Sequence, residues 1–349
     1  MATCGCEPFS VATIDIPFVT GGKPIRGFSM DCGGSLIKLT SIIEQNQDSL
    51  KVRFESYEAC RKGEVLDHIK STILTDSSSN LKMSTVGVTI GHGTIETHAE
   101  TISDVLGITP IQVDEFTAFT KGFHYGQKNL PRETFIKKNM QPETEKRGRE
   151  FPALLAMVGS AVGYILVNED GSHSQVNGTM MGGLYCYSVG KLLTGAKTYA
   201  EFAEMARRGD SKKLTVTTRD LFSGSYGDVD WDKVHSKIPF PLEVFPFGKI
   251  VREGLDIESL NKDDIARAWM HSVVAQILVT SVATAQKYCD ENRVVYYAGS
   301  FAENDVFQSF HDIMPHHVYY DNRTVYPCFL NNAAYLGSLG GLLVGLESL

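Results

Sequence analysis

The segment 28–39 constrains the fold most strongly, because it predicts two strands joined by a very tight turn. The chain turns through Gly33 and Gly34 and returns through Ser35 and Lys38. Glycines leave room for a large anion beside the backbone, and free N–H groups in such a turn attract phosphate oxygens. On its own, the segment also fits an ordinary β-hairpin. Its glycine spacing is neither that of a Walker A loop nor that of a dinucleotide-binding fingerprint.

Asp31 ends the first of these two strands, beside the glycine turn. Magnesium is usually held by one or two carboxylates together with the phosphates of a substrate. A carboxylate next to a phosphate-binding turn therefore suggests a site for a magnesium nucleotide, in which Lys38 adds a positive charge.

Further glycine turns occur in the second half of the chain. One contains Gly159 and Ser160, and another ends in Gly182 and Gly183. Glycine turns of the phosphate-binding type in both halves are what a nucleotide held between two lobes would require. This interpretation depends on the arrangement of the turns in both halves, not on any single turn.

The composition fits a folded protein of two lobes in a reducing compartment. The chain has 349 residues, enough for two cores, and its net charge of −8 argues against nucleic acid or an anionic membrane as the main partner. Seven scattered cysteines without a framework pattern predict free thiols and a cytoplasmic location. The N-terminus also lacks the basic and apolar regions of a secretory signal.

Periodicity and breaker residues predict a flexible leader at 1–25, an N-terminal lobe at 26–150 and a C-terminal lobe at 151–349. A polar connecting or surface region is expected at 126–150, before two strands at the start of the C-terminal lobe.

Within these lobes the sequence predicts strands at 153–157 and 162–167 and a short helix at 117–122. The longest helix is expected at 263–288, with an apolar stripe wide enough for burial on more than one side, so it is a core helix with a dimer interface as an additional role. A helix at 331–346 is rich in glycine, which would allow another backbone or a ligand to approach closely.

Three candidate general bases follow the predicted strand that ends before Gly91-His92-Gly93. They are Glu96, His98 and Glu100, and the two glutamates would share one face of a helix. The same acids are also typical of a solvated helix start, so the residues alone leave both interpretations open.

Several collinear motifs resemble the eukaryotic-type (type II) pantothenate kinases. The segment 31–38 resembles the first phosphate motif of that family, and the other motifs lie at 151–160, 178–183, 192–195, 203–211, 294–299 and 334–343. The resemblance implies the two-lobed α/β fold of the acetate and sugar kinase/Hsp70/actin (ribonuclease H-like) class, with ATP and Mg2+ in the interlobe cleft.

The resemblance also implies a reaction and partners. The reaction is phosphorylation of the terminal hydroxyl of pantothenate to 4'-phosphopantothenate, the first step of coenzyme A biosynthesis. The protein would be a cytoplasmic dimer, with itself or with a paralogue, and acyl-CoA would inhibit it by feedback. Neither nucleic acid nor a membrane is expected as a partner.

Carried over to this chain, the resemblance assigns Asp31 to catalysis and to magnesium. The residues expected to hold the nucleotide are Gly33, Gly34, Ser35, Lys38, Gly159, Ser160, Gly182 and Gly183.

The catalytic base and the substrate contacts depart from the family pattern. The base is assigned to Glu100, and Glu96 and His98 remain alternatives. The pantothenate contacts are assigned to Gln175 and Thr179, and Gln175 stands where the family has an arginine that pairs with the substrate carboxylate. These departures leave a second function open, in which the chain is a catalytically weak paralogue that regulates or supports an active kinase subunit.

Overall fold

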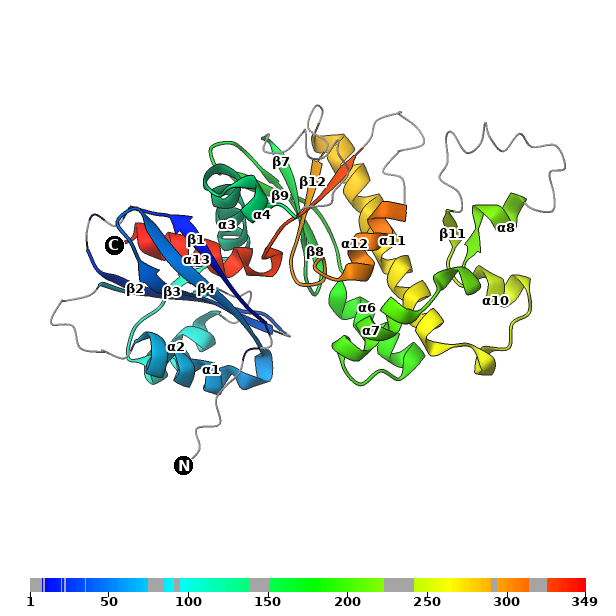
Figure 1. Ribbon diagram of the computed structural model, residues 1–349, viewed down its shortest axis with the longest axis horizontal. Helices are drawn as coiled ribbons and strands as arrows, with labels where there is room; N and C mark the ends of the chain where they lie inside the picture. The colour runs from blue at the N-terminus through cyan, green and yellow to red at the C-terminus, as the bar shows by residue number, and fades with distance from the viewer. Residues whose placement is uncertain are drawn as a thin grey trace. The chain divides into compact units, whose positions relative to one another are not determined.

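The computed structural model describes residues 8, 10–19, 21, 23–34, 36–74, 84–90, 95–137, 151–222, 242–289, 294–313 and 325–349, with the backbone alone at 84, 95–99, 222 and 312–313. The chain divides into two compact units (Figure 1). The first consists of Met1–Lys138, Val167–His173 and Leu330–Leu349, and the second of Asn139–Leu166 and Ser174–Phe329.

The first unit is built on a six-stranded sheet with the order β1-β4-β3-β2-β5-β6. The strands β1 to β4 pair antiparallel, whereas β5 and β6 add to β2 in parallel. The bounds are β1 Ser10–Pro17, β2 Ile25–Cys32, β3 Leu36–Gln45, β4 Ser49–Glu58, β5 Ser84–Ile90 and β6 Ile111–Val113.

Helices cover both faces of this sheet (Figure 1). They are η1 Ala59–Arg61, α1 Lys62–His68, the π-helix η2 Ile69–Ile73, α2 Ile95–Leu106, α3 Glu115–Asn129, α4 Arg132–Phe135, η5 Ala333–Tyr335 and α13 Leu336–Glu347. Phe28 and Met30 of β2 pack in one core cluster with α1 and α2. Side chains alternate along a strand, so Ser29 and Asp31 face the other side, where Gly341 and Gly337 of α13 lie against them.

The expected flexible leader at 1–25 is partly a strand. Residues Ser10–Pro17 form β1 at the edge of the first sheet, paired along their whole length with β4. Only Ile16 of this strand is buried, although Ala12, Ile14 and Ile16 stand at alternate positions, as in a strand with one apolar face.

The helix α13 belongs to the first unit, although residues 331–346 were expected in the C-terminal lobe. It packs against α3 at a very short distance, because glycines stand where the two helices meet. A Cβ on Gly340 would lie 1.7 Å from the carbonyl oxygen of Ala118, and one on Gly122 would lie 2.1 Å from that of Leu336. The close backbone approach predicted for these glycines is therefore confirmed.

The second unit contains a five-stranded sheet with the order β13-β12-β7-β8-β9 and a small sheet of β10 and β11. The strand β12 pairs in parallel with both β7 and β13, and the three-residue link between β7 and β8 requires an antiparallel pair. The bounds are β7 Ala153–Val158, β8 Val162–Val167, β9 His173–Thr179, β10 Val216–Thr217, β11 Glu243–Phe245, β12 Val294–Ala298 and β13 Tyr326–Phe329.

The two large sheets therefore share one strand order. In each, the first three strands of the common core form a meander, and the fourth and fifth add in parallel beside the first. The order is β4-β3-β2-β5-β6 in the first unit and β9-β8-β7-β12-β13 in the second. This repeated α/β arrangement is that of ribonuclease H-like units, so the predicted fold class is confirmed.

The helix α11, Lys262–Tyr288, forms the centre of the second core. It is long and apolar enough to cross a membrane, but 56% of its most apolar window is buried within the structure, as in a core helix. The hydroxyl of Tyr164 on β8 donates to its Ile277 carbonyl at 2.9 Å. The other helices of this unit are α6 Gly183–Thr194, α7 Tyr199–Arg208, η3 Ser211–Lys213, α8 Thr218–Phe222, α10 Gly248–Arg252, η4 Ile257–Ser259 and α12 Asp305–Ile313.

Candidate active site

Asp31 and Lys38 face each other across the β2–β3 hairpin of the first unit. They are register partners, and Lys38 Nζ donates to Asp31 Oδ2 at 3.2 Å. Asp31 is only 4% exposed, and a buried charge requires partners. A Cβ on Gly337, in the first turn of α13, would lie 3.2 Å from Oδ2. The start of a helix favours negative charge, so both Lys38 and α13 stabilise the carboxylate.

Gly33 and Gly34 form the turn of this hairpin but differ in what they offer a phosphate. The Gly33 N–H donates to the carbonyl of Leu36 at 3.0 Å, so the prediction of a free N–H is wrong for Gly33. Among the described residues other than its chain neighbours, no atom lies within 4 Å of a Cβ placed on Gly34, so these residues leave open space beside it. Ser35, the third residue of the predicted motif, lies outside the described residues.

Cys32 follows Asp31 but is not placed for nucleophilic chemistry. Burial is the main cause that raises the pKa of its thiol to about 11. The thiolate is the reactive form of cysteine, so Cys32 is protonated at neutral pH. It is a free thiol.

The carboxyl ends of β2, β5 and β6 lie at one edge of the first sheet, since Asp31 pairs with Ile90 and Ile90 with Val113. In α/β sheets, ligands bind outside this edge. Asp114 follows β6 there, but its carboxylate caps α3 by accepting from Thr117 N at 2.9 Å. Burial alone would raise the pKa of Asp114, whereas the hydrogen bonds from Thr117 lower it below its ordinary value. Sequence reasoning gave Asp114 no role, although Asp followed by a helix is a recognisable cap.

The three candidate bases lie on α2, which begins five residues after β5 ends. The side chain of Glu100 is exposed, whereas those of Glu96 and His98 lie outside the described residues. Glu100 lies about 7.5 Å along the axis of α2 from Ile95, the first residue of the helix. Glu96 is the second residue of α2 and lies nearer to that end than Glu100. The choice among the three candidate bases stays a prediction.

In the second unit, the structure brings together the four residues predicted to complete the nucleotide cradle. The Gly183 N–H donates to the Gly159 carbonyl at 2.8 Å, and the Leu184 N–H to that of Ser160 at 3.3 Å. A Cβ on Gly182 would lie 2.5 Å from the Ser160 carbonyl oxygen. The first N–H groups of α6 are thus occupied by the β7–β8 turn, so the binding role of these glycines remains a prediction.

Gly299 adds a third turn at the same edge of the second sheet, at the end of β12. Its φ is +98°, a conformation that favours glycine, and a Cβ there would lie 2.5 Å from the Val158 carbonyl oxygen. The same carbonyl accepts from the Phe301 N–H at 3.2 Å. Gly299 was absent from the predicted site, because only the parallel pairing of β7 and β12 reveals its place.

Gln175 and Thr179, the predicted substrate contacts, lie on the edge strand β9. Gln175 is exposed, and its amide donates to the Asn177 carbonyl at 3.5 Å. Thr179 Oγ1 accepts from the Met181 N–H at 3.2 Å. Asn177, between them, donates from its side chain to Thr284 Oγ1 of α11 at 2.8 Å. The strand is thus anchored to α11 at Asn177, while the Gln175 side chain remains available to a ligand.

The described residues contain no cluster of three or more metal-ligating side chains. Mg2+ keeps several waters and is usually bound through one or two carboxylates and substrate phosphates. The buried carboxylate of Asp31, in the hairpin that turns at Gly34, fits such a metal held mainly by water and nucleotide.

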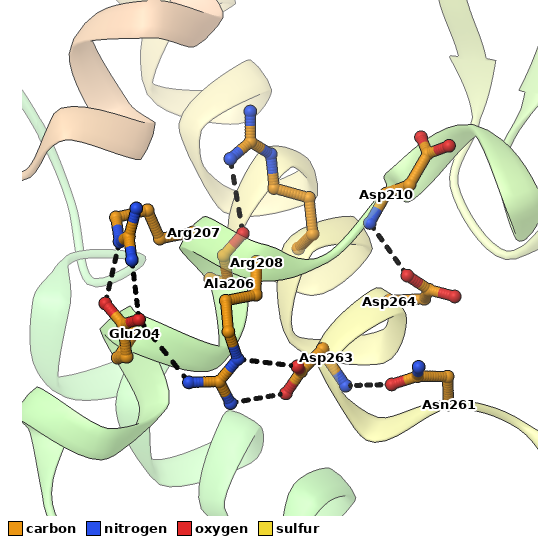
Figure 2. Close-up of polar contacts among 9 residues, drawn as sticks. Glu204, Ala206, Arg207, Arg208, Asp210, Asn261, Asp263 and Asp264 are labelled. Carbon is orange, nitrogen blue, oxygen red and sulfur yellow. Dashed lines mark hydrogen bonds and ion pairs between the residues drawn. The ribbon is translucent and has the colours of Figure 1, made fainter.

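The motif at 203–211 joins α7 to the start of α11 (Figure 2). Arg208 binds Asp263 through two hydrogen bonds of 2.9 and 3.0 Å, and Asp264 accepts from the Asp210 N–H at 2.8 Å. A Cβ on Gly209 would lie 2.0 Å from the Asp263 carbonyl oxygen. In this unit the motif is therefore a helix junction that sets the position of α11.

A sequence model of the Fumble family matches residues 27–344. A pantothenate kinase of Schizosaccharomyces pombe is 23% identical over 348 residues, covering 94% of this chain and 84% of the yeast protein. A mouse protein named 4'-phosphopantetheine phosphatase is 23% identical over 356 residues, covering 92% of this chain and 41% of that protein.

Among solved structures, the ethanolamine utilization protein EutJ from Carboxydothermus hydrogenoformans is similar with a TM-score of 0.48 and 11% identity. The match covers 94% of this chain and 93% of EutJ. The fold assignment rests instead on the strand order that the two sheets share.

Proposed function

The chain belongs to the Fumble family of pantothenate kinases, and we propose that it transfers a phosphoryl group from ATP to the terminal hydroxyl of pantothenate. The product would be 4'-phosphopantothenate, in the first step of coenzyme A biosynthesis. The observation that carries the proposal is the buried carboxylate of Asp31, paired with the partly exposed Lys38, in the hairpin that turns at Gly34. A hairpin with only a structural role needs no such pair, since replacing an ion pair by apolar residues is often neutral or stabilising.

In phosphoryl transfer the protein mainly positions the groups and neutralises charge. Lys38 and the turn at Gly33, Gly34 and Ser35 would hold the phosphates of ATP, with Gly33 only leaving room for them, because its N–H is bonded to the Leu36 carbonyl. Asp31 would hold Mg2+ through water, and the metal would supply charge neutralisation on the phosphates.

In the second unit, Gly159, Ser160, Gly182 and Gly183 would complete the nucleotide site. The compact packing at Gly182 supports a role for these residues in the shape of the site rather than as N–H donors.

Glu100 would orient the hydroxyl of pantothenate and take its proton, as a general base within hydrogen-bond reach does. Gln175 and Thr179 would contact the substrate. We propose in addition that the protein is a cytoplasmic dimer that uses the exposed side of α11, and that acyl-CoA inhibits it.

The second candidate function is that of a catalytically weak partner of an active kinase. Gln175 supports it, because an uncharged amide cannot form the charge-assisted bond that an arginine gives a carboxylate. The exposed position of Glu100 supports it as well.

A coupled assay of ADP release by the purified full-length chain, with Mg-ATP and with or without pantothenate, separates the two functions. A kinase releases ADP only when pantothenate is present. Binding of ATP, measured by calorimetry, without pantothenate-dependent turnover would instead support the regulatory partner. Loss of both ATP binding and turnover would reject both functions.

The same assay identifies the base through three variants, Glu96→Gln, His98→Gln and Glu100→Gln. Glu100→Gln is expected to abolish turnover while ATP affinity stays within about twofold, because a base acts on the acceptor hydroxyl and not on the nucleotide. Glu258→Gln, an exposed glutamate of the second unit, is the matched control. Full activity of Glu100→Gln would move the role to Glu96 or His98.

A further inference from the structure

The edge strand β9 contains the only Asn-Gly pair of the chain, Asn177 and Gly178. Both residues are exposed. Glycine has no Cβ, so its backbone nitrogen is unusually open to the side chain of the residue before it. The pair therefore presents an amide carbon and an unhindered nitrogen on two successive residues.

The fold holds these two groups against each other. The Gly178 N–H donates to Asn177 Oδ1 at 2.8 Å, and Oδ1 is bonded directly to the amide carbon, Cγ. The Gly178 nitrogen is therefore kept beside Cγ. An oriented intramolecular reaction is strongly favoured by such proximity, with reacting atoms about 3–3.5 Å apart.

A second hydrogen bond fixes the other end of the same amide. Asn177 Nδ2 donates to Thr284 Oγ1 of α11 at 2.8 Å, while the Thr284 hydroxyl donates its own hydrogen to the Thr280 carbonyl at 2.7 Å. This bond holds the Asn177 side chain in the orientation in which Oδ1 faces the Gly178 N–H.

We propose that Asn177 is a self-modification site, at which the Gly178 nitrogen displaces the side-chain amide as ammonia in the folded protein. The Gly178 N–H gives its proton to a solvent base, and the nitrogen forms a bond to Cγ. The bond from Cγ to Nδ2 then breaks, and the amide nitrogen takes a proton from solvent and leaves as ammonia. Water opens the cyclic imide at either carbonyl, which yields aspartate or isoaspartate at position 177 without any oxidant or reductant.

The product changes how β9 is held against α11. A carboxylate accepts hydrogen bonds and cannot donate, so the bond from position 177 to Thr284 Oγ1 is lost. The Thr284 hydroxyl already donates to Thr280, so two acceptors would face each other. The modification therefore loosens the strand and adds a negative charge to it. It uses only Asn177, Gly178 and water, so it is independent of the proposed kinase reaction.

Peptide mapping by mass spectrometry tests the proposal on the purified full-length chain, incubated in its folded state at mildly alkaline pH. Asn168 is the matched control, because it is also exposed and its Nδ2 also donates to a hydroxyl, that of Ser172 at 3.0 Å, whereas Glu169 follows it. Aspartate and isoaspartate are expected to accumulate at position 177 while Asn168 stays intact. An intact Asn177, equal rates at both positions, or modification of Asn177 only after unfolding in urea would overturn the proposal.

Gly178→Ala tests whether the glycine nitrogen is the attacking group. Gly178 lacks the positive φ that would strain an alanine, and its Cβ would lie 3.2 Å from the Val162 carbonyl oxygen, so a small shift accommodates it. The added methyl group hinders the nitrogen, and accumulation of product at position 177 is expected to fall several-fold. Ser174→Ala, at an exposed position of the same strand, should keep the wild-type rate. An undiminished rate in folded Gly178→Ala would reject the site.

Asn177→Gln provides a second measurement if Gly178→Ala unfolds. The longer side chain keeps the amide but moves its carbon away from the Gly178 nitrogen, and attack would have to close a larger ring. Loss of ammonia at position 177 is therefore expected to stop on the timescale of the wild-type reaction. An unchanged rate would mean that water attacks the amide directly, and it would reject the role of Gly178.

Discussion

The first hairpin of each large sheet occupies the same place in a shared strand order, yet the two hairpins differ in content. The β2–β3 hairpin carries an ion pair between the buried Asp31 and the partly exposed Lys38, and the described residues leave open space at Gly34. The β7–β8 turn carries no such pair, and its carbonyl groups accept from the first N–H groups of α6. One hairpin thus keeps charge and room for a ligand, whereas the other is filled by its own neighbouring helix. A common topology therefore fixes where a site can form, and the local residues decide which of two equivalent turns is free to bind.

The largest expected effect comes from removing the charge that distinguishes the first hairpin. Asp31→Asn should reduce kcat of the proposed pantothenate-dependent reaction at least about 100-fold, because removing one preorganised electrostatic group at a reaction centre typically has that effect. Steady-state kinetics with Mg-ATP and pantothenate measure it. Asp48→Asn, an exposed aspartate at the β3–β4 turn, should behave as wild type. An Asp31→Asn variant that is folded and fully active would remove the functional difference between the two hairpins.

The second prediction contrasts the glycines of the two turns in stability. In Gly182→Ala the new Cβ would lie 2.5 Å from the Ser160 carbonyl and 2.7 Å from Ala161 Cα. The backbone must shift, and overpacking of this kind costs about 1–3 kcal/mol of unfolding free energy. Gly34→Ala meets open space and should change stability by less than about 0.5 kcal/mol.

Denaturant unfolding of both glycine variants measures the contrast. Because Gly34 is the proposed phosphate contact, Gly34→Ala should nevertheless raise the KM for ATP in the coupled assay. Equal losses of stability in the two variants would contradict the description of one turn as filled and the other as open.

Local sequence patterns predicted the elements on both sides of this comparison. The strands β2 and β3 of the first unit, and β7, β8 and the helix α11 of the second, occur where alternation, glycine turns and apolar periodicity placed them. The helix at 117–122 was expected to end at Gly122, but α3 continues to Asn129. Gly122 therefore lies inside this helix and does not end it. Its missing side chain leaves room for the Leu336 carbonyl, which packs against the helix there.

Relations between distant segments were the part that local patterns could not supply. The assignment of α13 to the first unit depends on its contact with α3, more than 200 residues earlier in the sequence. The Glu243–His271 pair joins β11 to α11, and neither residue stands in a motif.

The third prediction concerns the buried Glu243–His271 pair of the second unit. The pKa of His271 is lowered in the folded state, mainly by burial and also by the charges of Arg267 and Lys212, against the attraction of Glu243. The unfolded chain therefore binds a proton near pH 6.5, where the folded chain does not. Stability from this group is fully present above about pH 6.5 and is lost as the pH falls.

Urea unfolding of wild type and His271→Phe between pH 7.5 and 5 measures this loss. The wild-type free energy of unfolding should fall more steeply, by up to about 1.4 kcal/mol per pH unit, since one fewer proton is taken up by the unfolded variant. Glu243 also has a lowered pKa, so its share is lost only at lower pH, below about 4.3. Parallel curves for the two proteins between pH 6.5 and 5 would show that His271 is protonated in the folded state.

The smallest effect is expected at the α7–α11 junction, where exposed charges accompany a glycine contact (Figure 2). The Arg208 side chain is 49% exposed, and solvent screening limits exposed ion pairs to about 0–1 kcal/mol. Arg208→Ala should therefore lower the free energy of unfolding only slightly, despite its two hydrogen bonds to Asp263. Gly209→Ala, the neighbouring control, should cost more, because its Cβ would lie 2.0 Å from the Asp263 carbonyl oxygen. The reverse order in urea unfolding would mean that charge, and not backbone contact, holds α11 in the second unit.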